Sequence, residues 1–346
     1  MPQVYTYFMK LLVTGGLGFI GTNFIRYWFN AHPQDHITNL DKITYAANPL
    51  NLSDLESNPN YTFIQGDILD APLVENLVAQ VDLIVHFAAE SHVDRSIDDP
   101  LMFVKTNVMG TYTLLKAAQR NNTRFHHIST DEVYGTVDPN TTEEFSETTS
   151  FDPTSPYAAS KASSDHFVLS FFKTFGLPIT ITNCSNNYGP YQNPEKLIPR
   201  LITNLVNNSK IPVYGKGENI RDWLYVTDHC RAIEAVIMKG TIGETYCIGG
   251  LKESCRNIDI VKKVIALMGK SEDLIEYVTD RPAHDNYRVS WKKINETLGW
   301  EPKESLESGL KKTIDWYLAN TQWWQASKTE AEEFYKKLNN YQKVKF

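Results

Sequence analysis

The feature that most constrains the fold is a glycine-rich turn near the N-terminus, at residues 14–21. Its glycines fit the pattern G-x-G-x-x-G from position 16, and Gly15, Gly18 and Gly21 fit a wider variant. An apolar run, Lys10–Thr14, precedes the turn, and Phe19–Phe29 follows with apolar residues at helical spacing. A strand, a glycine turn and a helix in this order are typical of a phosphate-binding turn, because glycine lets the backbone approach a pyrophosphate.

Beyond this turn, short apolar runs alternate with longer amphipathic stretches. The alternation predicts an α/β fold of the Rossmann type, with a doubly wound parallel sheet and helices on both faces. One helix is predicted for Leu101–Arg120, and another after Ser155-Pro156, since serine caps helices well and proline suits their first position. The predicted strands are Lys10–Thr14, Ile37–Leu40, Tyr61–Gln65, Leu83–Phe87, Phe125–Ser129 and Ile179–Asn183.

The texture of the sequence changes after Asn183, where prolines, glycines and aromatic residues become frequent. We therefore expect a dinucleotide-binding domain over residues 9–185, to which a segment near 222–247 returns. A smaller C-terminal substrate-binding lobe is expected over residues 186–330 and a charged tail over 331–346, with residues 1–8 as a small extension. The Lys- and Glu-rich end from Trp323 onward is predicted to form an exposed helix.

The position of an acidic residue favours NAD as the cofactor. Asp41 lies 20 residues after Gly21, at the end of the second predicted strand. A carboxylate there can bind both ribose hydroxyls and would repel a 2′-phosphate, although Lys42 beside it could attract one. Asp67, after the third strand, could bond the adenine amino group, and the small pair Ala88-Ala89 would let a cofactor lie across the strand ends.

A tyrosine and a lysine form the first part of a catalytic group. Tyr157 and Lys161 are four residues apart and so share one face of a helix. A phenol has a pKa of about 10, but a nearby ammonium and a positive nicotinamide ring would lower it. Tyr157 could then take a proton from a substrate hydroxyl, while Lys161 could hold the ribose and Thr130 could bond the reacting oxygen.

Asp131 and Glu132 suggest a second reaction at the same site. Alcohol oxidation needs no further acid or base, whereas elimination of water needs one group to remove a carbon-bound proton and another to protonate the departing hydroxyl. Neighbouring carboxylates in different surroundings can take these opposite states. Two solvated acids at a strand end would give the same pattern, but the position directly after Thr130 favours chemistry.

Bulk properties exclude several other classes. The net charge of −7 disfavours nucleic acid as a partner, and no apolar run approaches the length of a membrane span. The N-terminus lacks a signal-peptide pattern, and the four cysteines show no C-x-x-C spacing. We therefore expect a cytoplasmic protein with reduced thiols, no metal site and no membrane contact.

Together these residues closely resemble the nucleotide-sugar 4,6-dehydratases of the extended short-chain dehydrogenase/reductase family, over roughly Lys10 to Trp324. Epimerases and decarboxylases of that family share the glycines and the Y-x-x-x-K spacing, but they usually lack the adjacent Asp-Glu after Thr. The strings that carry the resemblance are Asn39–Ala46, Ala88–Ser96, Thr130–Gly135, Asn183–Tyr191, Pro194–Pro199, Asn219–Leu224 and Asp280–Pro282.

The resemblance implies an enzyme that removes water from a sugar through a transient ketone. Tyr157 would deprotonate the C4 hydroxyl while NAD takes the C4 hydride. Glu132 would remove the C5 proton, Asp131 would protonate the C6 hydroxyl, and the hydride would return to C6. The product would be a 4-keto-6-deoxy sugar, and the catalytic set would be Thr130, Asp131, Glu132, Tyr157 and Lys161.

The resemblance also implies binding residues. NAD would contact Gly15, Gly18, Phe19, Ile20, Gly21, Asp41, Lys42, Ile43, Thr44, Asp67, Ile68, Phe87, Ala88, Ala89, Ser91, Thr106, Tyr157, Lys161 and Asn187. The nucleotide sugar would contact Ser91, Thr130, Asn186, Lys196, Leu197, Pro212, Val213, Tyr214, Arg221, Asn257, Arg281, His284 and Asp285.

The expected substrate is dTDP-glucose, and the expected assembly is a homodimer packed through helices. Three alternatives stay open at this point: UDP-glucose as the substrate, an epimerase or decarboxylase, and a catalytically silent NAD-binding protein. The chain departs from the family pattern at Ala47 and Ala283, where glycine is usual, which leaves the base of the nucleotide undecided.

Overall fold

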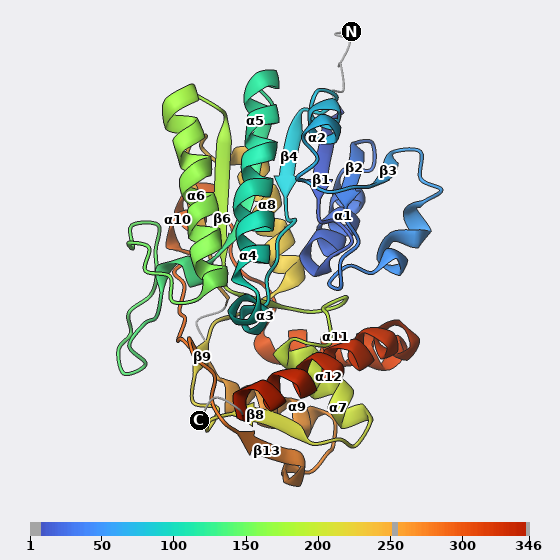
Figure 1. Cartoon of the computed structure of the whole chain (residues 1–346), viewed down its shortest axis with the longest axis vertical. Helices are drawn as coiled ribbons and strands as arrows, with labels where there is room; N and C mark the ends of the chain where they lie inside the picture. The colour runs from blue at the N-terminus through green and yellow to red at the C-terminus, as the bar shows by residue number, and fades with distance from the viewer. Residues whose placement is uncertain (1–7, 251–254, 344–346) are drawn as a thin grey trace.

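The computed structural model describes residues 8–250 and 255–343, so all but Phe8 of the predicted N-terminal extension lies outside the described residues. A seven-stranded sheet in which every neighbouring pair is parallel forms the centre (Figure 1), in the order β3-β2-β1-β4-β5-β6-β11. The predicted Rossmann-type fold class is therefore confirmed. The strands are β1 (Lys10–Thr14), β2 (His36–Asp41), β3 (Tyr61–Gln65), β4 (Leu83–His86), β5 (Arg124–Thr130), β6 (Ile179–Cys184) and β11 (Thr245–Ile248).

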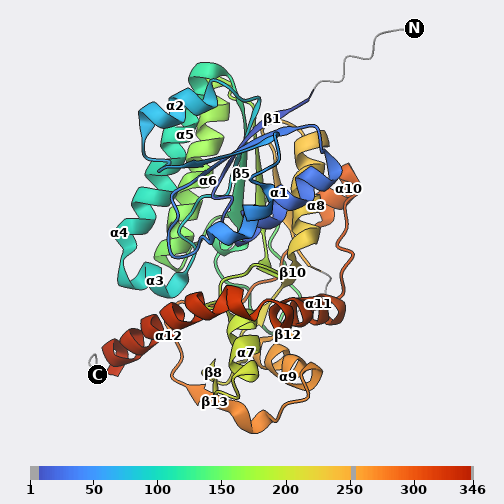
Figure 2. The same ribbon diagram turned by 90° about the vertical axis from the view of Figure 1, so that its right-hand side faces the viewer.

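Helices cover both faces of this sheet (Figure 2). Phe24 and Trp28 are completely buried on one face, and Leu114 and Val168 on the other. Each such side chain stabilises the fold by roughly 1.5–3 kcal/mol, which is why the strands are apolar on both sides. The helices are α1 (Phe19–Ala31) and α8 (Val226–Lys239) on one face, and α2 (Ala71–Val78), α5 (Thr111–Asn121) and α6 (Pro156–Phe175) on the other.

The start of α6 is as predicted, because the Ser155 side chain caps the helix by accepting a hydrogen bond from the Ala158 N–H at 3.1 Å. The predicted helix Leu101–Arg120 is interrupted. It consists of α4 (Pro100–Phe103), a π-helical stretch η2 (Val104–Gly110) and α5. Within η2 the buried Asn107 amide pairs with the backbone N–H and C=O of Glu90, at 2.8 and 2.9 Å. This contact ties the widened turn to the loop that follows β4, and such π-helical turns are frequent at functional sites.

A second lobe lies below the sheet in Figure 1 and has its own apolar core, which includes Ile202, Leu205, Val261 and Leu310. β11 pairs with β6 and α8 packs beside α1, so the chain returns to the first domain between segments of this lobe. The remaining elements are η1 (Pro49–Leu55), α3 (Val93–Asp98), η3 (Asp131–Tyr134), β7 (Asn186–Tyr188), α7 (Leu197–Val206), β8 (Ile211–Tyr214), β9 (Ile220–Arg221), β10 (Trp223–Tyr225), β12 (Cys255–Arg256), α9 (Asn257–Leu267), η4 (Glu272–Leu274), β13 (Ile275–Val278), α10 (Lys292–Leu298), α11 (Leu306–Ala319) and α12 (Thr321–Lys343).

The last helix, α12, crosses the molecule between the two lobes (Figure 2). The prediction of an exposed helix is wrong for one of its faces, since Trp324, Ala331 and Tyr335 are buried. These residues are seven and four apart and so share one face of the helix, which the abundant lysines and glutamates conceal in the sequence. Among the described residues, no helix is both long enough and apolar enough to cross a bilayer.

Candidate functional site

The glycine turn lies where β1 and β4 are adjacent at the centre of the sheet and their chain connections diverge, which is where open α/β sheets bind ligands. Gly15 has a φ of +74°, and a Cβ there would come within 2.7 Å of the Ala88 backbone. A Cβ on Gly21 would lie 2.4 Å from the Gly15 carbonyl oxygen. α1 begins after Gly18 without a side-chain cap, so its first N–H groups are available to an anion.

Asp41 ends β2 next to this turn. Its Oδ2 accepts a hydrogen bond from the Leu17 N–H and its Oδ1 accepts one from the Ile43 N–H, both at 2.9 Å. Burial raises the pKa of Asp41, while these two hydrogen bonds lower it. Lys42 Nζ lies 2.7 Å from Asp67 Oδ2, so its charge is paired within the protein and is not free to attract a second phosphate. The glycine turn, the uncapped start of α1 and the Asp41 carboxylate form a site that fits NAD.

The other predicted cofactor residues mostly lie at the same edge of the sheet. Ile43 has a φ of +59°, which is strained for a β-branched residue. Thr106 lies in η2, and Asn187 lies in β7. Two of the predicted cofactor residues, Phe19 and Ile20, directly follow the glycine turn. The others lie just after strands β2, β3 and β4, and they are Lys42, Ile43, Thr44, Asp67, Ile68, Phe87, Ala88 and Ala89.

The predicted catalytic residues meet at the end of β5. Thr130 caps the short helix η3: its Oγ1 accepts a hydrogen bond from the Glu132 N–H at 3.3 Å and donates one to Asp131 Oδ1 at 3.2 Å. The Tyr157 hydroxyl, on α6, lies close enough to the Thr130 side chain and to both carboxylates for all three to shift its pKa. Four of the five predicted catalytic residues are thus in mutual contact or electrostatic reach.

The two carboxylates have different surroundings. Asp131 is 1% exposed, and its Oδ2 has no hydrogen-bond partner among the described residues. Burial raises its pKa well above the ordinary value, and the charges of Glu132 and Asp222 raise it further. Burial also raises the pKa of the half-buried Glu132, but three cations oppose this change. Those cations are Arg281, Arg221 and Lys196.

Tyr157 differs from the sequence prediction. Burial, followed by the charge of Glu132, raises its pKa well above the ordinary value, and the Thr130 side chain lowers it. The expected lowering by Lys161 is wrong for the protein alone, because the Lys161 ammonium donates instead to the Ile128 carbonyl at 2.7 Å. The phenol therefore keeps its proton until another positive charge comes near it.

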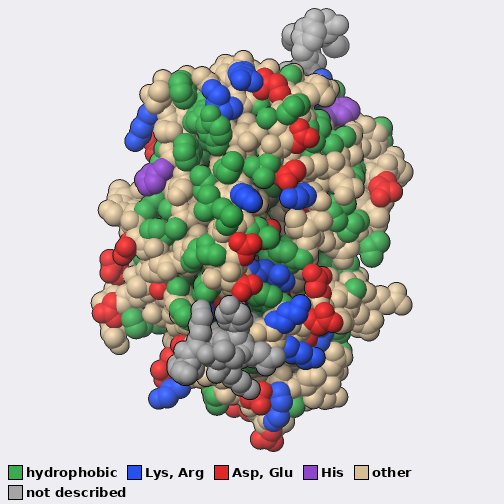
Figure 3. Space-filling model, in the orientation of Figure 1, with side chains coloured by type: hydrophobic (Ala, Val, Ile, Leu, Met, Phe, Trp, Pro, Cys, Tyr) green, Lys and Arg blue, Asp and Glu red, His purple; other side chains and the backbone are tan. Residues whose placement is uncertain are grey.

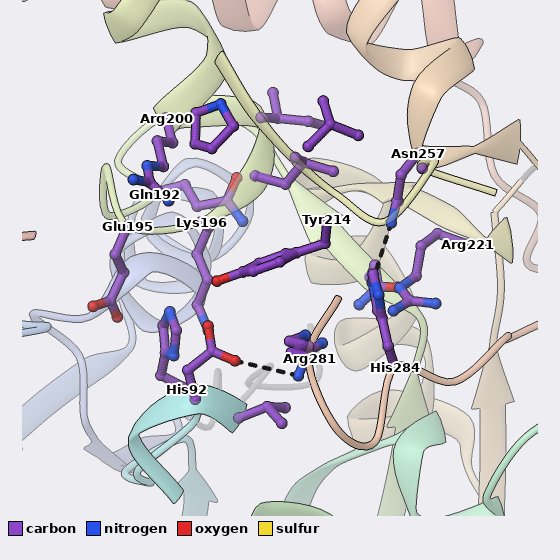
Figure 4. Close-up of a pocket in the computed structure, with 18 of the residues that line it drawn as sticks. His92, Gln192, Glu195, Lys196, Arg200, Tyr214, Arg221, Asn257, Arg281 and His284 are labelled. Atoms are coloured by element: carbon purple, nitrogen blue, oxygen red, sulfur yellow. Dashed lines mark hydrogen bonds and ion pairs between the residues drawn. The ribbon is translucent and has the colours of Figure 1, made fainter. Parts of the chain in front are cut away.

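A cavity of about 1100 Å³, its open mouth included, adjoins this group, and Figure 4 shows residues that line it. In Figure 3, Lys and Arg side chains gather across the middle of the same face. Four cations and three carboxylates line the cavity, so it is locally positive in a chain of net charge −7. Such a site suits a diphosphate. The charged residues are Lys196, Arg200, Arg221, Arg281, Asp94, Glu132 and Glu195.

Hydrogen bonds hold the lining side chains in place. Lys196 Nζ donates to the Ser91 carbonyl at 2.9 Å, and Arg281 NH1 lies 3.5 Å from Asp94 Oδ1. His284 Nε2 lies 3.5 Å from the Asn257 amide nitrogen, and Figure 4 shows this pair at the opposite side of the cavity from Lys196. The amide oxygen of Asn257 has no hydrogen-bond partner among the described residues, and so it is available to a ligand.

α12 closes one wall of the cavity. The Tyr335 hydroxyl donates to the Glu195 carbonyl at 3.0 Å and lies 3.2 Å from His92 Nε2. The Arg200 guanidinium stacks on the Tyr335 ring at 3.6 Å. In this way α12, from the far end of the chain, holds Glu195 and Arg200 in place at the start of α7.

Most of the predicted substrate residues line this cavity, as do two of the predicted cofactor residues, Ser91 and Asn187. Thr130 and Asp285 are outside the lining, and the Asp285 carboxylate instead accepts hydrogen bonds from Thr154 and Tyr287. The predicted residues in the lining are Ser91, Asn186, Lys196, Leu197, Pro212, Val213, Tyr214, Arg221, Asn257, Arg281 and His284.

Sequence reasoning missed several lining residues. His92 and Asp94 lie within a string that supported the resemblance, and Arg200 follows Lys196 by one helical turn, so both signals were present. Tyr335 had no such signal, because its place depends on contacts distant in sequence. The other missed lining residues include Gln192, Glu195, Trp223 and Tyr287.

The similar proteins identified by sequence are nucleotide-sugar 4,6-dehydratases. A sequence model of the GDP-mannose 4,6 dehydratase family matches residues 12–313. The chain is 50% identical to dTDP-glucose 4,6-dehydratase 1 of Escherichia coli K12, over 91% of this chain and 94% of that protein. It is 46% identical to the dTDP-glucose 4,6-dehydratase of Mycobacterium tuberculosis H37Rv, over 94% and 98% of the two chains.

The solved structures similar to this chain also include a dTDP-glucose 4,6-dehydratase. The dTDP-glucose 4,6-dehydratase DesIV of Streptomyces venezuelae, crystallised with NAD bound, superimposes with a TM-score of 0.89 at 44% identity, over 92% of this chain and all of that one. A UDP-glucuronic acid 4-epimerase of Bacillus cereus gives a TM-score of 0.84 at only 30% identity, over 90% and 99%. The fold is thus shared with epimerases, while the higher identity is with dehydratases.

Proposed function

The chain belongs to the nucleotide-sugar 4,6-dehydratase family, and on this basis we propose that it is an NAD-dependent lyase that converts dTDP-glucose to dTDP-4-keto-6-deoxyglucose. The single observation that carries the proposal is the pair Asp131 and Glu132, adjacent acids near Tyr157 whose neighbouring charges differ: carboxylates raise the pKa of Asp131, whereas cations lower that of Glu132. An epimerase would need no such pair, since it moves no water.

We assign the proton transfers to three residues. Tyr157 removes the proton of the C4 hydroxyl, and Thr130 holds the same oxygen. When bound, NAD accepts a hydride from C4 of the sugar and later returns it to C6. The C4 ketone acidifies the C5 proton, which Glu132 removes as the general base, and Glu132 gives a proton back to C5 when C6 receives the hydride. Asp131, whose pKa burial raises well above the ordinary value, gives its proton to the C6 hydroxyl, and that group leaves as water.

The proposed binding residues form two groups, one around the glycine turn and one in the neighbouring cavity. The glycine turn, Asp41 and the ends of β3 and β4 would hold the dinucleotide. Lys196, Arg221 and Arg281 would neutralise the diphosphate of the sugar nucleotide, because charge-assisted hydrogen bonds to phosphate need cations in a partly buried site. Tyr214 and Asn257, farther along the cavity, would contact the rest of the nucleotide.

We further propose that the protein acts as a cytoplasmic homodimer. Leu101, Met102, Met109 and Tyr112, on the segment from α4 to α5, are between 45% and 57% exposed, and Phe167 on the neighbouring α6 is 39% exposed. A second copy could cover these apolar side chains, which otherwise face water. The four free cysteines, three of them buried, are compatible with a reducing compartment.

Product analysis tests the proposed activity. Purified protein is incubated with dTDP-glucose and, separately, with UDP-glucose, and the products are identified by NMR. We expect the 4-keto-6-deoxy sugar from dTDP-glucose, with no accumulation of NADH over many turnovers. A 4-epimer, or steady conversion of added NAD to NADH, would refute the proposed reaction.

A further inference from the structure

Lys161 lies in a closed polar pocket on the side of β5 that faces α6. The lysine is 4% exposed, and its ammonium donates to the Ile128 carbonyl at 2.7 Å and lies 3.4 Å from His127 Nε2. These contacts leave a buried positive charge with only uncharged partners in hydrogen-bond range. A buried ammonium is costly unless a negative charge is close.

The negative charge nearby is Asp165, one turn farther along α6 and 1% exposed. Its Oδ2 accepts hydrogen bonds from Ser129 Oγ at 2.9 Å and from the Asn183 amide at 3.0 Å. Its Oδ1 lies 3.2 Å from His127 Nε2, the same ring atom that faces Lys161. Two neighbours on β5, Ser129 and His127, and one on β6, Asn183, thus surround this one carboxylate.

His127 mediates between the two charges. It is completely buried, and burial lowers its pKa far below the ordinary value, so the ring is neutral and carries one proton. Its Nε2 lies 3.4 Å from the Lys161 ammonium and 3.2 Å from Asp165 Oδ1, so the ring lies between the two charges without adding a charge of its own.

We propose that Asp165 is a positioning residue whose buried carboxylate keeps Lys161 charged and in place, one helical turn from Tyr157 on α6. This inference rests on the proposed function, since it concerns the same proton transfer. The roles assigned to Tyr157, Glu132 and Asp131 do not require Asp165, which is not among the residues that line the cavity.

The electrostatics of the pocket agree with this geometry. Burial lowers the pKa of Lys161 to about 8, and Asp165 is the first charge that opposes this change. Burial raises the pKa of Asp165 to about 6, and Lys161 lowers it. The other titratable neighbours, apart from His166, are held neutral by burial near pH 8, and they are His86, His127, Tyr134 and Cys184.

A pH profile separates this role from a general structural one. Asp165→Asn removes the negative charge that counters the effect of burial on Lys161, so the pKa of Lys161 falls. The alkaline limit of kcat should then move to lower pH by about one unit, and the loss of activity should be larger at pH 8 than at pH 6.5. Asp165→Ser should move the limit in the same direction. A loss by the same factor at every pH would overturn the proposal.

Ser129→Ala is the matched control. It removes a neutral hydrogen bond to the same carboxylate but leaves the charge, because Asp165 stays ionised well above its pKa of about 6. The alkaline limit should therefore stay at its wild-type pH. A shift as large as that of Asp165→Asn would show that packing, and not charge, sets the limit.

A stability measurement covers the case in which the neutral variants fold poorly. Urea unfolding at pH 8 is compared for the wild type, Asp165→Asn, Lys161→Met and the double variant, without substrate. Each single change leaves one buried charge alone, so the double variant should lose less than the sum of the two shifts in midpoint, and should fold even if Asp165→Asn does not. Additive losses would contradict the pairing. This result is independent of activity, whereas failure of wild-type enzyme to dehydrate dTDP-glucose would refute only the proposed function.

Discussion

Asp131 and Glu132 are consecutive in the chain, yet opposite charges surround them. The groups that act most on Asp131 after burial are the carboxylates of Glu132 and Asp222, whereas the groups that act most on Glu132 are the cavity's arginines. The 3-10 turn capped by Thr130 creates this difference, since it turns one side chain toward the core and the other toward the cavity lining. Two acids of nearly equal intrinsic strength can in this way serve as acid and base.

Glu132→Gln should stop removal of the C5 proton. The amide keeps the size of the side chain but cannot accept a proton, so we expect kcat to fall by about 10²–10⁴-fold. Oxidation at C4 should continue for a single turnover. The measurement is deuterium uptake at C5 in D₂O, followed by NMR, together with the absorbance of bound NADH in one turnover.

The matched control for this change is Glu143→Gln, an exposed acid outside the cavity lining, which should behave as the wild type. Continued deuterium uptake at C5 in Glu132→Gln would remove Glu132 from the role of base.

Asp131→Asn should remove activity and yet stabilise the fold at neutral pH. The folded-state pKa of Asp131 is raised, so the protein loses stability as pH rises above the ordinary pKa of aspartate and up to the raised value. The amide avoids that cost, and a gain of about 1 kcal/mol in the free energy of unfolding is expected at pH 8. Near pH 4 the gain should be much smaller, because the carboxyl is protonated in the folded protein and only about half ionised in the unfolded chain.

Urea unfolding at the two pH values checks this prediction. If Asp131→Asn is equally stable or less stable than the wild type at pH 8, Asp131 is not a strained acid in the folded protein.

Local patterns explain why the strands, the glycine turn and the start of α6 could be predicted. The strand over Tyr61–Gln65 and the cap at Ser155 depend on neighbours within a few residues, and both are found as predicted. The predicted catalytic residues also meet, since Thr130 ends a strand and Tyr157 begins a helix beside it.

The features that could not be predicted depend on contacts between residues far apart in the sequence. The buried face of α12 requires a hydrogen bond between Tyr335 and Glu195, which are 140 residues apart. Likewise, spacing alone placed Lys161 beside Tyr157, but the ammonium is held by the Ile128 carbonyl of a strand 33 residues earlier. Periodicity describes a helix face, but it does not say which partner covers it.

Ala283→Gly should stabilise the protein. Ala283 has a φ of +52°, in the left-handed region that costs a residue with a Cβ about 1–2 kcal/mol. Glycine removes that strain but gains freedom in the unfolded chain, so a net gain of about 0.5–1 kcal/mol is expected in urea unfolding. Ala47→Gly is the control, because Ala47 does not have a positive φ, and there glycine should destabilise. A loss of stability at both positions would contradict the role of strain.

Tyr335→Phe should weaken binding of the nucleotide sugar but not of NAD. The change deletes the hydroxyl that bonds the Glu195 carbonyl and lies next to His92, and unsatisfied buried groups of this kind cost about 1–3 kcal/mol. Glu195 immediately precedes Lys196, and its side chain also pairs with Arg95 at 3.2 Å, so this wall of the cavity should loosen. We expect KM for dTDP-glucose to rise by about tenfold with little change in kcat, which steady-state kinetics would measure. Lys336→Ala, an exposed neighbour on α12, is the control. If Tyr335→Phe binds the substrate as the wild type does, α12 serves only to hold the fold together.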